Sequence, residues 1–187
     1  MNIFLDRKRE KRREFIRQLF NYVITVIIAL TLAFCFVEFL FQTTSVVGDS
    51  MSPVLVNKDD ALLFKGAYVF KEPKRNDIIK FTIEKSDKKH EYIKRIVALP
   101  GETVQIVDGV LLVDGKAAEG VTFTDAIASA GIAYKEIKLG KKEYFVMGDN
   151  CNNSEDSRFS NVGAVTEEEI NGRIVATIDG FNINRIN

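Results

Sequence analysis

The pattern of apolar and polar positions divides the 187-residue chain into three parts. Residues 1–18 are largely polar, and residues 19–41 consist mostly of Leu, Ile, Val, Phe and Ala. From residue 42 onward, short apolar or β-branched segments alternate with clusters rich in Gly, Pro, Asn and Asp. This order predicts a polar tail, one long apolar helix and a domain of short β-strands.

The apolar segment is long enough to cross a membrane. Its 23 residues would span roughly 34 Å as a helix, and the hydrocarbon core of a bilayer is about 30 Å thick. Glu38 is its only charge and lies near the outer end, where a side chain can reach the interface. The run is longer than the apolar core of a cleavable signal peptide, and no Ala-x-Ala follows it closely. We therefore predict that residues 19–41 form one uncleaved transmembrane helix.

Charge is unevenly placed, although the formal net charge is zero. Residues 1–17 carry seven Lys or Arg side chains against three acids, a surplus of four, so the rest of the chain is net acidic by four. A basic run beside an apolar segment is typical of a cytoplasmic flank. We expect residues 1–18 in the cytoplasm and residues 42–187 outside the plasma membrane. A net acidic domain argues against a nucleic-acid partner.

The third part has the pattern of a mainly β domain. Asp108-Gly109 between two apolar runs is a strong hairpin signal, and residues 116–142 are less regular. We predict an antiparallel β domain in which residues 108–142 form a hairpin and a small inserted lobe. A short helical turn is expected at residues 166–169. The predicted strands are 43–47, 61–64, 77–83, 92–99, 103–107, 110–113, 143–147 and 173–178.

The two cysteines predict neither a disulfide nor a metal site. Cys35 lies in the apolar segment and Cys151 far downstream, so the two sulfur atoms are not expected to meet. No Cys or His spacing typical of a metal site occurs. We expect no metal and no other cofactor. An exported domain without paired cysteines fits a bacterium that does not depend on disulfides here.

Residues 48–53, Gly-Asp-Ser-Met-Ser-Pro, contain the candidate nucleophile, Ser50. A serine among small residues before a proline is typical of a tight turn, and most such serines are only turn residues. Ser50, however, follows the apolar segment by nine residues, an extended reach of at most roughly 30 Å. It would therefore act near the bilayer surface. Serine is a weak nucleophile until a base takes its proton.

Two residues are candidates for that base: His90, the only histidine, and Lys94. Most lysines are solvated surface charges. Lys94 lies within a β-branched run, and alternation along a strand puts it on one face with Tyr92 and Ile96. An apolar environment lowers a lysine pKa and makes the neutral amine a general base. The opposite face is also apolar, so periodicity does not show which face is buried. We predict a Ser50–Lys94 dyad.

Residues 148–158, Gly-Asp-Asn-Cys-Asn-Asn-Ser-Glu-Asp-Ser-Arg, form the third candidate block. It can be interpreted as a surface loop with local Asx and Ser turns. The functional interpretation is that the Ser154 hydroxyl orients the lysine amine. In that interpretation, ion pairs hold the loop in place through Asp149, Asp156 and Arg158.

Together these blocks resemble the boxes of bacterial type I signal peptidases with a single anchor. Residues 48–53 resemble the Ser-Met-x-Pro box, and residues 74–81 resemble the Arg-Gly-Asp-Ile-Val-Val-Phe box, with Asn76 in place of the glycine. Residues 92–102 resemble the lysine box, and residues 148–158 resemble the Gly-Asp-Asn box. The four boxes follow the order of the family behind an apolar segment. The resemblance implies a signal-peptidase-like folded antiparallel β domain with a small inserted lobe.

The resemblance also implies roles for individual residues. Ser50 would be the nucleophile and Lys94 the general base, with Ser154 beside the lysine. Supporting ion pairs would join Asp149 to Arg95 and Asp156 to Arg158, and substrate contacts would come from Met51 and Pro53. Gly48 stands where some relatives carry a hydroxyl that helps bind the oxyanion. Backbone N–H groups at Ser50 and Gly48 are expected to do so here.

The implied function is the removal of signal peptides from exported preproteins through an acyl-enzyme, after small residues at the −1 and −3 positions. Its partners would be preprotein signal peptides, membrane lipid and the secretion translocon. Two alternatives remain: a self-cleaving repressor-like Ser–Lys peptidase, and a non-catalytic membrane-anchored β scaffold for export or pilus assembly. Residues 128–130, Ala-Ser-Ala, resemble a cleavage site within the chain itself, which we interpret as a chance match.

Overall fold

The computed structural model describes residues 3–85, 88–121, 123–180 and 182–186. The chain separates into two compact units, Met1–Leu40 and Phe41–Asn187. Residues 1, 2, 86, 87, 122, 181 and 187 belong to segments that the sequence analysis predicts, but they lie outside the described residues.

The first unit is a single helix, α1, from Ile3 to Leu40. It includes the basic residues predicted as a tail, because Arg, Lys and Glu favour helix and no Gly or Pro occurs before residue 48. From Arg12 to Leu40 it is long and apolar enough to cross a membrane by length and composition. Apolar side chains are exposed all around this part of the helix, which suits lipid rather than water. The helix ends one residue before the predicted boundary.

Phe41 opens strand β1 (Phe41–Ser45) instead of closing the helix. It is paired with Phe64 in strand β2 (Asp60–Phe64), and the two rings stack with centroids 4.8 Å apart. The residues that follow, Gln-Thr-Thr-Ser, include β-favouring threonines. Cross-strand pairing therefore decides the conformation of Phe41.

The second unit is mainly antiparallel β-structure, as the sequence predicts. Its larger sheet has eight strands in the order β1-β2-β11-β3-β4-β9-β10, and β12 also pairs with β11. The remaining strands of this sheet are β3 (Ile78–Lys85), β4 (Lys88–Ala98), β9 (Glu143–Met147), β10 (Val165–Thr166), β11 (Ile170–Asp179) and β12 (Asn182–Arg185). The last predicted strand lies within β11, and β12 follows it.

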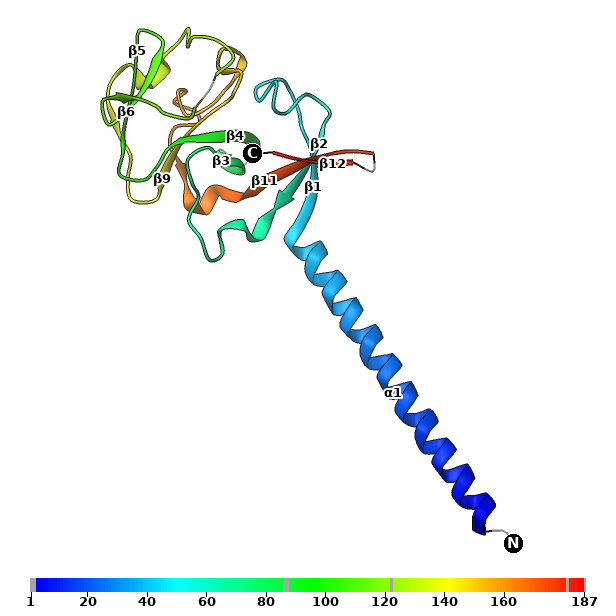
Figure 1. The fold of residues 1–187 in the computed structure, drawn as a ribbon. Coiled ribbons are helices and arrows are strands. Elements are labelled where there is room, and N and C mark those ends of the chain that lie inside the picture. The colour runs from blue at the N-terminus through cyan, green and yellow to red at the C-terminus, as the bar shows by residue number, and fades with distance from the viewer. Residues whose placement is uncertain (1–2, 86–87, 122, 181, 187) are drawn as a thin grey trace. The chain divides into compact units, whose positions relative to one another are not determined.

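A smaller sheet has the order β7-β6-β5-β8. Its strands are β5 (Thr103–Val107), β6 (Val110–Val113), β7 (Lys116–Ala117) and β8 (Ile137–Lys138). Asp108 and Gly109 have positive φ angles, as the predicted tight hairpin requires. Within the domain, β5 and β6 lie at the end opposite to β1 and β2 (Figure 1). The less regular residues 116–142 therefore contribute short strands to a sheet that already begins at Thr103.

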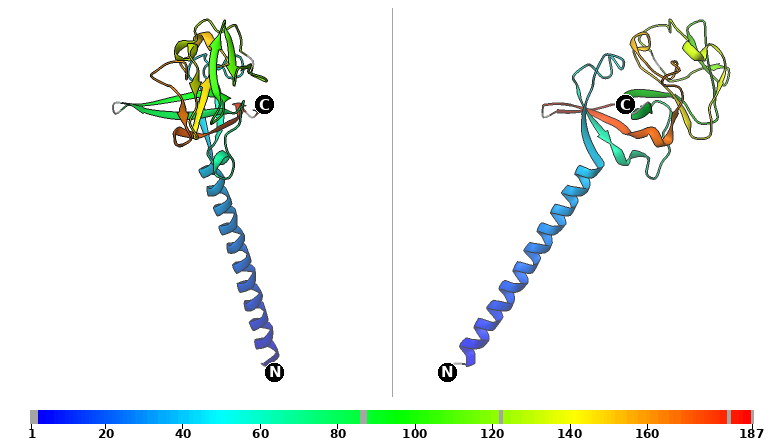
Figure 2. Two further views of the ribbon diagram at one scale, coloured as in Figure 1. Left: turned by 90° about the vertical axis from the view of Figure 1, so that its left-hand side faces the viewer. Right: turned by 180° about the vertical axis from the view of Figure 1, so that it is seen from behind.

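Four 3₁₀ turns complete the domain. They are η1 (Lys65–Tyr68), η2 (Gly131–Tyr134), η3 (Cys151–Asn153) and η4 (Glu167–Glu169). A capping box at Thr166 and Glu169 fixes η4, where the sequence predicts a helical turn. The outer part of the β3–β4 hairpin extends beyond the other strands in the left view of Figure 2.

Three buried apolar clusters hold the domain together. One lies under the smaller sheet around Val97, Phe145 and Met147, and a second contains Ile79, Phe81, Ile96 and Val146. The third consists of Val46, Met51, Leu55, Ala61, Leu63, Ile78 and Ile174. Met51 is only 1% exposed, so the residue after Ser50 anchors the candidate nucleophile to the core.

The second cluster gives a direct test of the fold. Phe81 is fully buried and stacks on Tyr92 with ring centroids 5.4 Å apart. Phe81→Ala should reduce the free energy of unfolding by about 3–5 kcal/mol, because it removes buried area and leaves a cavity. Thermal unfolding of the full chain in detergent micelles measures the effect. Phe70→Ala is the matched control: its ring is 94% exposed, so a change within about 0.5 kcal/mol is expected. Equal losses in both variants would contradict the described packing.

Candidate active site

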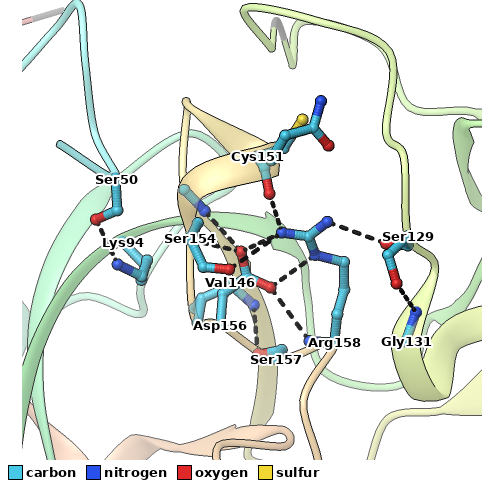
Figure 3. A network of polar contacts seen from close by, with 12 residues as sticks. Ser50, Lys94, Ser129, Gly131, Val146, Cys151, Ser154, Asp156, Ser157 and Arg158 are labelled. Atoms are coloured by element: carbon cyan, nitrogen blue, oxygen red, sulfur yellow. Dashed lines mark hydrogen bonds and ion pairs between the residues drawn. The ribbon is translucent and has the colours of Figure 1, made fainter.

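Ser50 and Lys94 are in contact although 44 residues separate them along the chain. Lys94 Nζ lies 2.6 Å from Ser50 Oγ, and Figure 3 shows the two side chains pointing toward each other. Lys94 projects from the middle of β4, and Ser50 begins a turn after β1. A hydroxyl at this distance from an amine can pass its proton directly to it.

The loop after β9 fixes the backbone of the nucleophile. The Asn150 N–H donates a hydrogen bond of 3.0 Å to the Ser50 carbonyl. The Asn150 side-chain amide donates to the Asp49 carbonyl at 3.2 Å. Together with the buried Met51, these bonds restrain Ser50 from both sides.

Lys94 is buried, with only 4% of its surface exposed. Its cross-strand neighbour is Ile79, which belongs to the same apolar cluster as Ile96. Periodicity could not show which face of β4 is buried because both are: Ile96 belongs to one apolar cluster and Val97 to another. Burial lowers the pKa of Lys94 to about 8, although the nearby carboxylates of Asp156 and Glu155 act in the opposite direction. A substantial fraction of the amine is therefore neutral near physiological pH.

His90 lies on the outer, exposed part of β4. Its ring stacks on Tyr92 with centroids 6.5 Å apart. Among the residues that the structure describes, no hydrogen bond joins His90 to Ser50. The only histidine is thus not placed as the base for Ser50.

A buried carboxylate organises the third block. Asp156 is fully buried and accepts hydrogen bonds from the Ser154 hydroxyl at 2.7 Å and the Gly148 N–H at 3.2 Å. Arg158 donates to it from Nε at 2.8 Å and from Nη2 at 2.9 Å. The same guanidinium also donates to the carbonyls of Cys151 and Ser129. Figure 3 shows this network beside the dyad.

The Ser154 hydroxyl therefore has a different partner from the one we expected. The sequence analysis has it orienting the lysine amine, whereas in the structure it donates to Asp156. A buried, charged acceptor is a stronger partner for a hydroxyl than an amine is. Ser154 still lies close to the nucleophile, and the reason is Gly148.

Gly148 lies between the two serines. A Cβ atom there would lie 2.4 Å from Ser154 Oγ and 2.4 Å from the Ser50 carbonyl oxygen. Only glycine allows this approach, because real Cβ contacts are essentially never that short. Sequence reasoning treats Gly148 only as part of a turn. Its place before Asp149 in the Gly-Asp-Asn motif is the signal that could have identified it.

Arg95 and Asp149 form a two-pronged ion pair. Arg95 donates from Nε to Oδ1 and from Nη2 to Oδ2 of Asp149, both at 2.7 Å. Its Nη1 donates to the Asn76 carbonyl at 2.9 Å. Alternation along β4 directs Arg95 to the face opposite Lys94. The pair links β4 to the loop after β9, as the resemblance implies.

Gly48 has a φ angle of +84°, a conformation that favours glycine. Its N–H donates to the side-chain oxygen of Asn57 at 3.0 Å. That N–H is therefore already engaged and does not point to an oxyanion in this conformation. Within the described part of the chain, no acceptor is bonded to the Ser50 N–H. Sequence reasoning did not identify Asn57.

Two hollows lie in this part of the domain, and only the first has the dyad in its wall. The first has a volume of about 340 Å³ and is lined by Thr44, Ser45, Val46, Val47, Ser50, Met51, Lys80, Glu91, Tyr92, Ile93 and Lys94. The second, of about 360 Å³, is lined by Pro53, Val54, Arg95, Gly120, Phe123, Thr124 and Asp149. Met51 and Pro53, the predicted substrate contacts, thus line different hollows. Thr44, Lys80 and Glu91 in the first hollow are further residues that sequence reasoning did not single out.

The described residues contain no cluster of three or more His, Cys, Asp and Glu side chains suited to a metal ion. Cys35 and Cys151 are both free thiols, the first exposed and the second buried. Burial raises the pKa of the Cys151 thiol, which disfavours its reactive thiolate.

Comparisons with known proteins show which proteins this chain is similar to. The model of a family described as signal peptidase, peptidase S26, matches residues 19–178. Signal peptidase I of Bacillus licheniformis is 33% identical over 171 residues, which cover 88% of this chain and 90% of that protein. Signal peptidase I T of Bacillus subtilis is 36% identical over 164 residues, 84% of this chain and 83% of that protein. A signal peptidase I structure from Enterococcus faecalis has 27% identity and a TM-score of 0.44, covering 56% of this chain and 98% of that chain.

The close approach at Gly148 generates a prediction. Gly148→Ala should slow acylation of Ser50 by a serine-directed acylating probe by about 100-fold, because a displacement of roughly 1 Å is enough for such a loss. Mass spectrometry of the labelled protein measures the rate. Gly115→Ala is the control: no atom lies within 4 Å of its Cβ, so the added methyl group meets no clash, although its φ of +75° is left-handed and that of Gly148 is not. If both variants were acylated at the wild-type rate, the tight contact would have no functional consequence.

Proposed function

The chain belongs to the signal peptidase family, peptidase S26, and we propose that it cleaves preproteins with Ser50 as nucleophile and Lys94 as general base. Members of this family are enzymes that remove signal peptides. The observation that carries the assignment is the 2.6 Å separation between Lys94 Nζ and Ser50 Oγ. The low exposure and lowered pKa of Lys94 support the role of base.

The reaction begins with neutral Lys94. Its Nζ takes the proton from Ser50 Oγ while that oxygen attacks the scissile carbonyl carbon. The tetrahedral intermediate collapses, Lys94 gives the proton to the leaving amine, and the C–N bond breaks. The acyl-enzyme that remains is an ester of Ser50. Lys94 then takes a proton from water, whose oxygen attacks the ester and releases the cleaved signal peptide.

The oxyanion needs hydrogen-bond donors during both attacks. The Ser50 N–H is the first donor, because it is free of partners in the described part of the chain. Gly48 is not a second donor, because its N–H already donates to Asn57; its part is limited to the left-handed turn before Ser50. That turn determines the direction in which the following amides point.

Two ion pairs position the dyad rather than touch the reacting atoms. Asp156 and Arg158 hold the Ser154 segment, while Arg95 and Asp149 join β4 to the loop that bonds the Ser50 backbone. Both carboxylates are almost fully buried. Because buried charges are costly unless paired, each pair should be sensitive to the loss of either member.

The first hollow is suited to an extended substrate. Residues 44–47 and residues 91–94 of β4 both line it. An extended segment can add to such strands through its main chain, with alternate side chains entering pockets. We assign the −1 residue to the region beside Ser50 and Met51, which line the same hollow.

In this proposal, the apolar helix keeps the domain at the membrane that carries its substrates. Ser50 follows Leu40 by ten residues, an extended reach of at most about 36 Å. We propose that the basic N-terminal residues lie in the cytoplasm and that the domain works outside the membrane. Signal peptides still held in lipid beside the translocon would then present their cleavage sites at the depth of Ser50.

The Ala-Ser-Ala segment at residues 128–130 is held by the polar network. The Ala128 N–H donates to the Asn152 side chain at 2.9 Å, and the Ser129 carbonyl accepts from Arg158 at 3.1 Å. A substrate segment must instead form its main-chain hydrogen bonds with the strands that line the cleft. These bonds favour the interpretation of the Ala-Ser-Ala segment as a chance match.

The dyad is tested by three variants of the full chain in detergent, with a preprotein that carries an Ala-x-Ala site. Ser50→Ala and Lys94→Met should each lower kcat/KM by at least about 1,000-fold while leaving the thermal unfolding temperature nearly unchanged. His90→Ala is the matched control and should retain wild-type cleavage, because its ring is remote from the hydroxyl. An inactive His90→Ala together with an active Lys94→Met would reverse the assignment of the base.

The lowered pKa of Lys94 predicts the pH profile. The neutral amine is the active form, so kcat/KM should rise about tenfold per pH unit below the pKa of about 8 and level off above it. An unperturbed lysine would keep the rate rising toward pH 10. Single-turnover cleavage between pH 6 and 10 measures the profile. A plateau already reached at pH 6 would exclude Lys94 as the titrating base.

A further inference from the structure

Glu155 is a carboxylate at the edge of the active site that the proposed reaction does not use. It lies between Ser154 and Asp156, which are both buried, but Glu155 itself is exposed. Its Oε2 accepts a hydrogen bond of 3.1 Å from the hydroxyl of Tyr92, and its Oε1 accepts one from the side-chain amide of Asn161. These two contacts restrain a surface carboxylate that would otherwise rotate freely in water.

Tyr92 connects this carboxylate to the base. Tyr92 lies two residues before Lys94 on β4, so both side chains project from the same face of the sheet. Lys94 Nζ lies 5.9 Å from the centroid of the Tyr92 ring, and the buried ring of Phe81 stacks on the same ring. Tyr92 and Lys94 both line the hollow that contains Ser50. The Tyr92 ring therefore forms part of the wall beside the amine.

We propose that Glu155 is a positioning residue: it holds the Tyr92 ring against the amine of Lys94, and its charge stabilises the protonated form of that amine. This inference rests on the proposed function and concerns the control of its base. The ring affects how well the amine is held beside Ser50, whereas the charge affects how much of the amine is neutral at a given pH. The two effects can therefore be separated by substitution.

Glu155 differs from the other charged groups around Lys94, because those groups are neutralised by partners. They are Asp156 with Arg158, Asp149 with Arg95 and, in the wall of the hollow, Lys80 with Glu91. None of the ion pairs among the described residues includes Glu155. Burial lowers the pKa of Lys94 to about 8, and the carboxylates of Asp156 and Glu155 oppose this effect. Burial and the hydrogen bond to Glu155 raise the pKa of Tyr92, so its hydroxyl remains a donor.

Glu155→Gln removes the charge but keeps a side-chain oxygen that can accept from the Tyr92 hydroxyl. Its pH profile of kcat/KM should shift to lower pH by about half a unit, because the neutral amine becomes easier to form. Cleavage at pH 6.5 should then be about threefold faster than in wild type, with a plateau at high pH within about twofold. The measurement is single-turnover cleavage of a preprotein with an Ala-x-Ala site by the full chain in detergent between pH 6 and 10. A purely structural defect would instead lower the rate at every pH.

Two further variants remove the hydrogen bond. Glu155→Ala and Tyr92→Phe should each lower the plateau about fivefold, the effect of one modest hydrogen bond. Only Glu155→Ala should also shift the profile to lower pH, because Tyr92→Phe retains the carboxylate.

Glu84→Gln is the matched control, since this carboxylate is 65% exposed and lies on the neighbouring strand β3. Its cross-strand partner is Lys89, five residues before Lys94 on β4, a separation of about 17 Å along the strand. Solvent and salt screen a charge at that distance, so the control should have the wild-type profile.

The possible outcomes separate this inference from the proposed function. An unshifted profile in Glu155→Gln, or one shifted to higher pH, would overturn the role of the charge. Wild-type plateaus in both Glu155→Ala and Tyr92→Phe would overturn the role of the hydrogen bond. In either case, cleavage by wild type would leave Ser50 and Lys94 in their proposed roles. If folded wild type cleaves no preprotein, the proposed function is wrong, and this inference is wrong with it.

Discussion

The removal of one lysine amine from water is the constraint on which this site depends. A solvated lysine is protonated at neutral pH and cannot take a proton from serine. Burial of Lys94 between β3 and β9 lowers its pKa, but the carboxylates of Asp156 and Glu155 oppose this effect. Arg158 acts in the same direction as burial, and it also binds Asp156 directly. Because Arg158 partly offsets the charge of Asp156, this buried carboxylate can organise the loop while the pKa of Lys94 stays lowered.

The contact between Ser50 and Lys94 depends equally on backbone packing. Met51 is buried in one apolar cluster, whereas the core neighbours of Lys94 belong to another. The loop after β9 joins these two parts, because Asn150 bonds the Ser50 carbonyl and Gly148 lies against it. A rigid dyad at 2.6 Å is therefore a property of three chain segments rather than of two side chains. The close fit at Gly148 is thus as much a part of the placement of the dyad as the two side chains are.

Much of this architecture could be predicted from local sequence patterns. Strands β5, β6 and β9 begin and end at the predicted residues, because turn residues such as Asp108-Gly109 mark their limits. Other features depend on long-range pairing that one sequence does not reveal. Phe41 joins a strand because Phe64 lies opposite. Strand β12 pairs with residues 176–179 of β11, which lie beyond the pairing of β11 with β3. In the site, the order of motifs predicted which segments matter. The order of motifs did not reveal which group accepts the hydrogen bond of Ser154, or that the Gly48 N–H donates to Asn57. Several acceptors compete for each of these donors, and one sequence does not show which of them is bonded.

The two lysines that line the cleft differ in the partners of their amines. Lys94 meets a neutral hydroxyl, whereas Lys80 meets a carboxylate and a hydroxyl. An adjacent carboxylate favours the charged form of an amine, and an apolar environment favours the neutral form. Strand alternation keeps the two apart, because Lys94 is paired with Ile79 on one face and Lys80 with Ile93 on the other. A base and a cation can therefore share one narrow cleft, provided that the sheet between them keeps their partners separate.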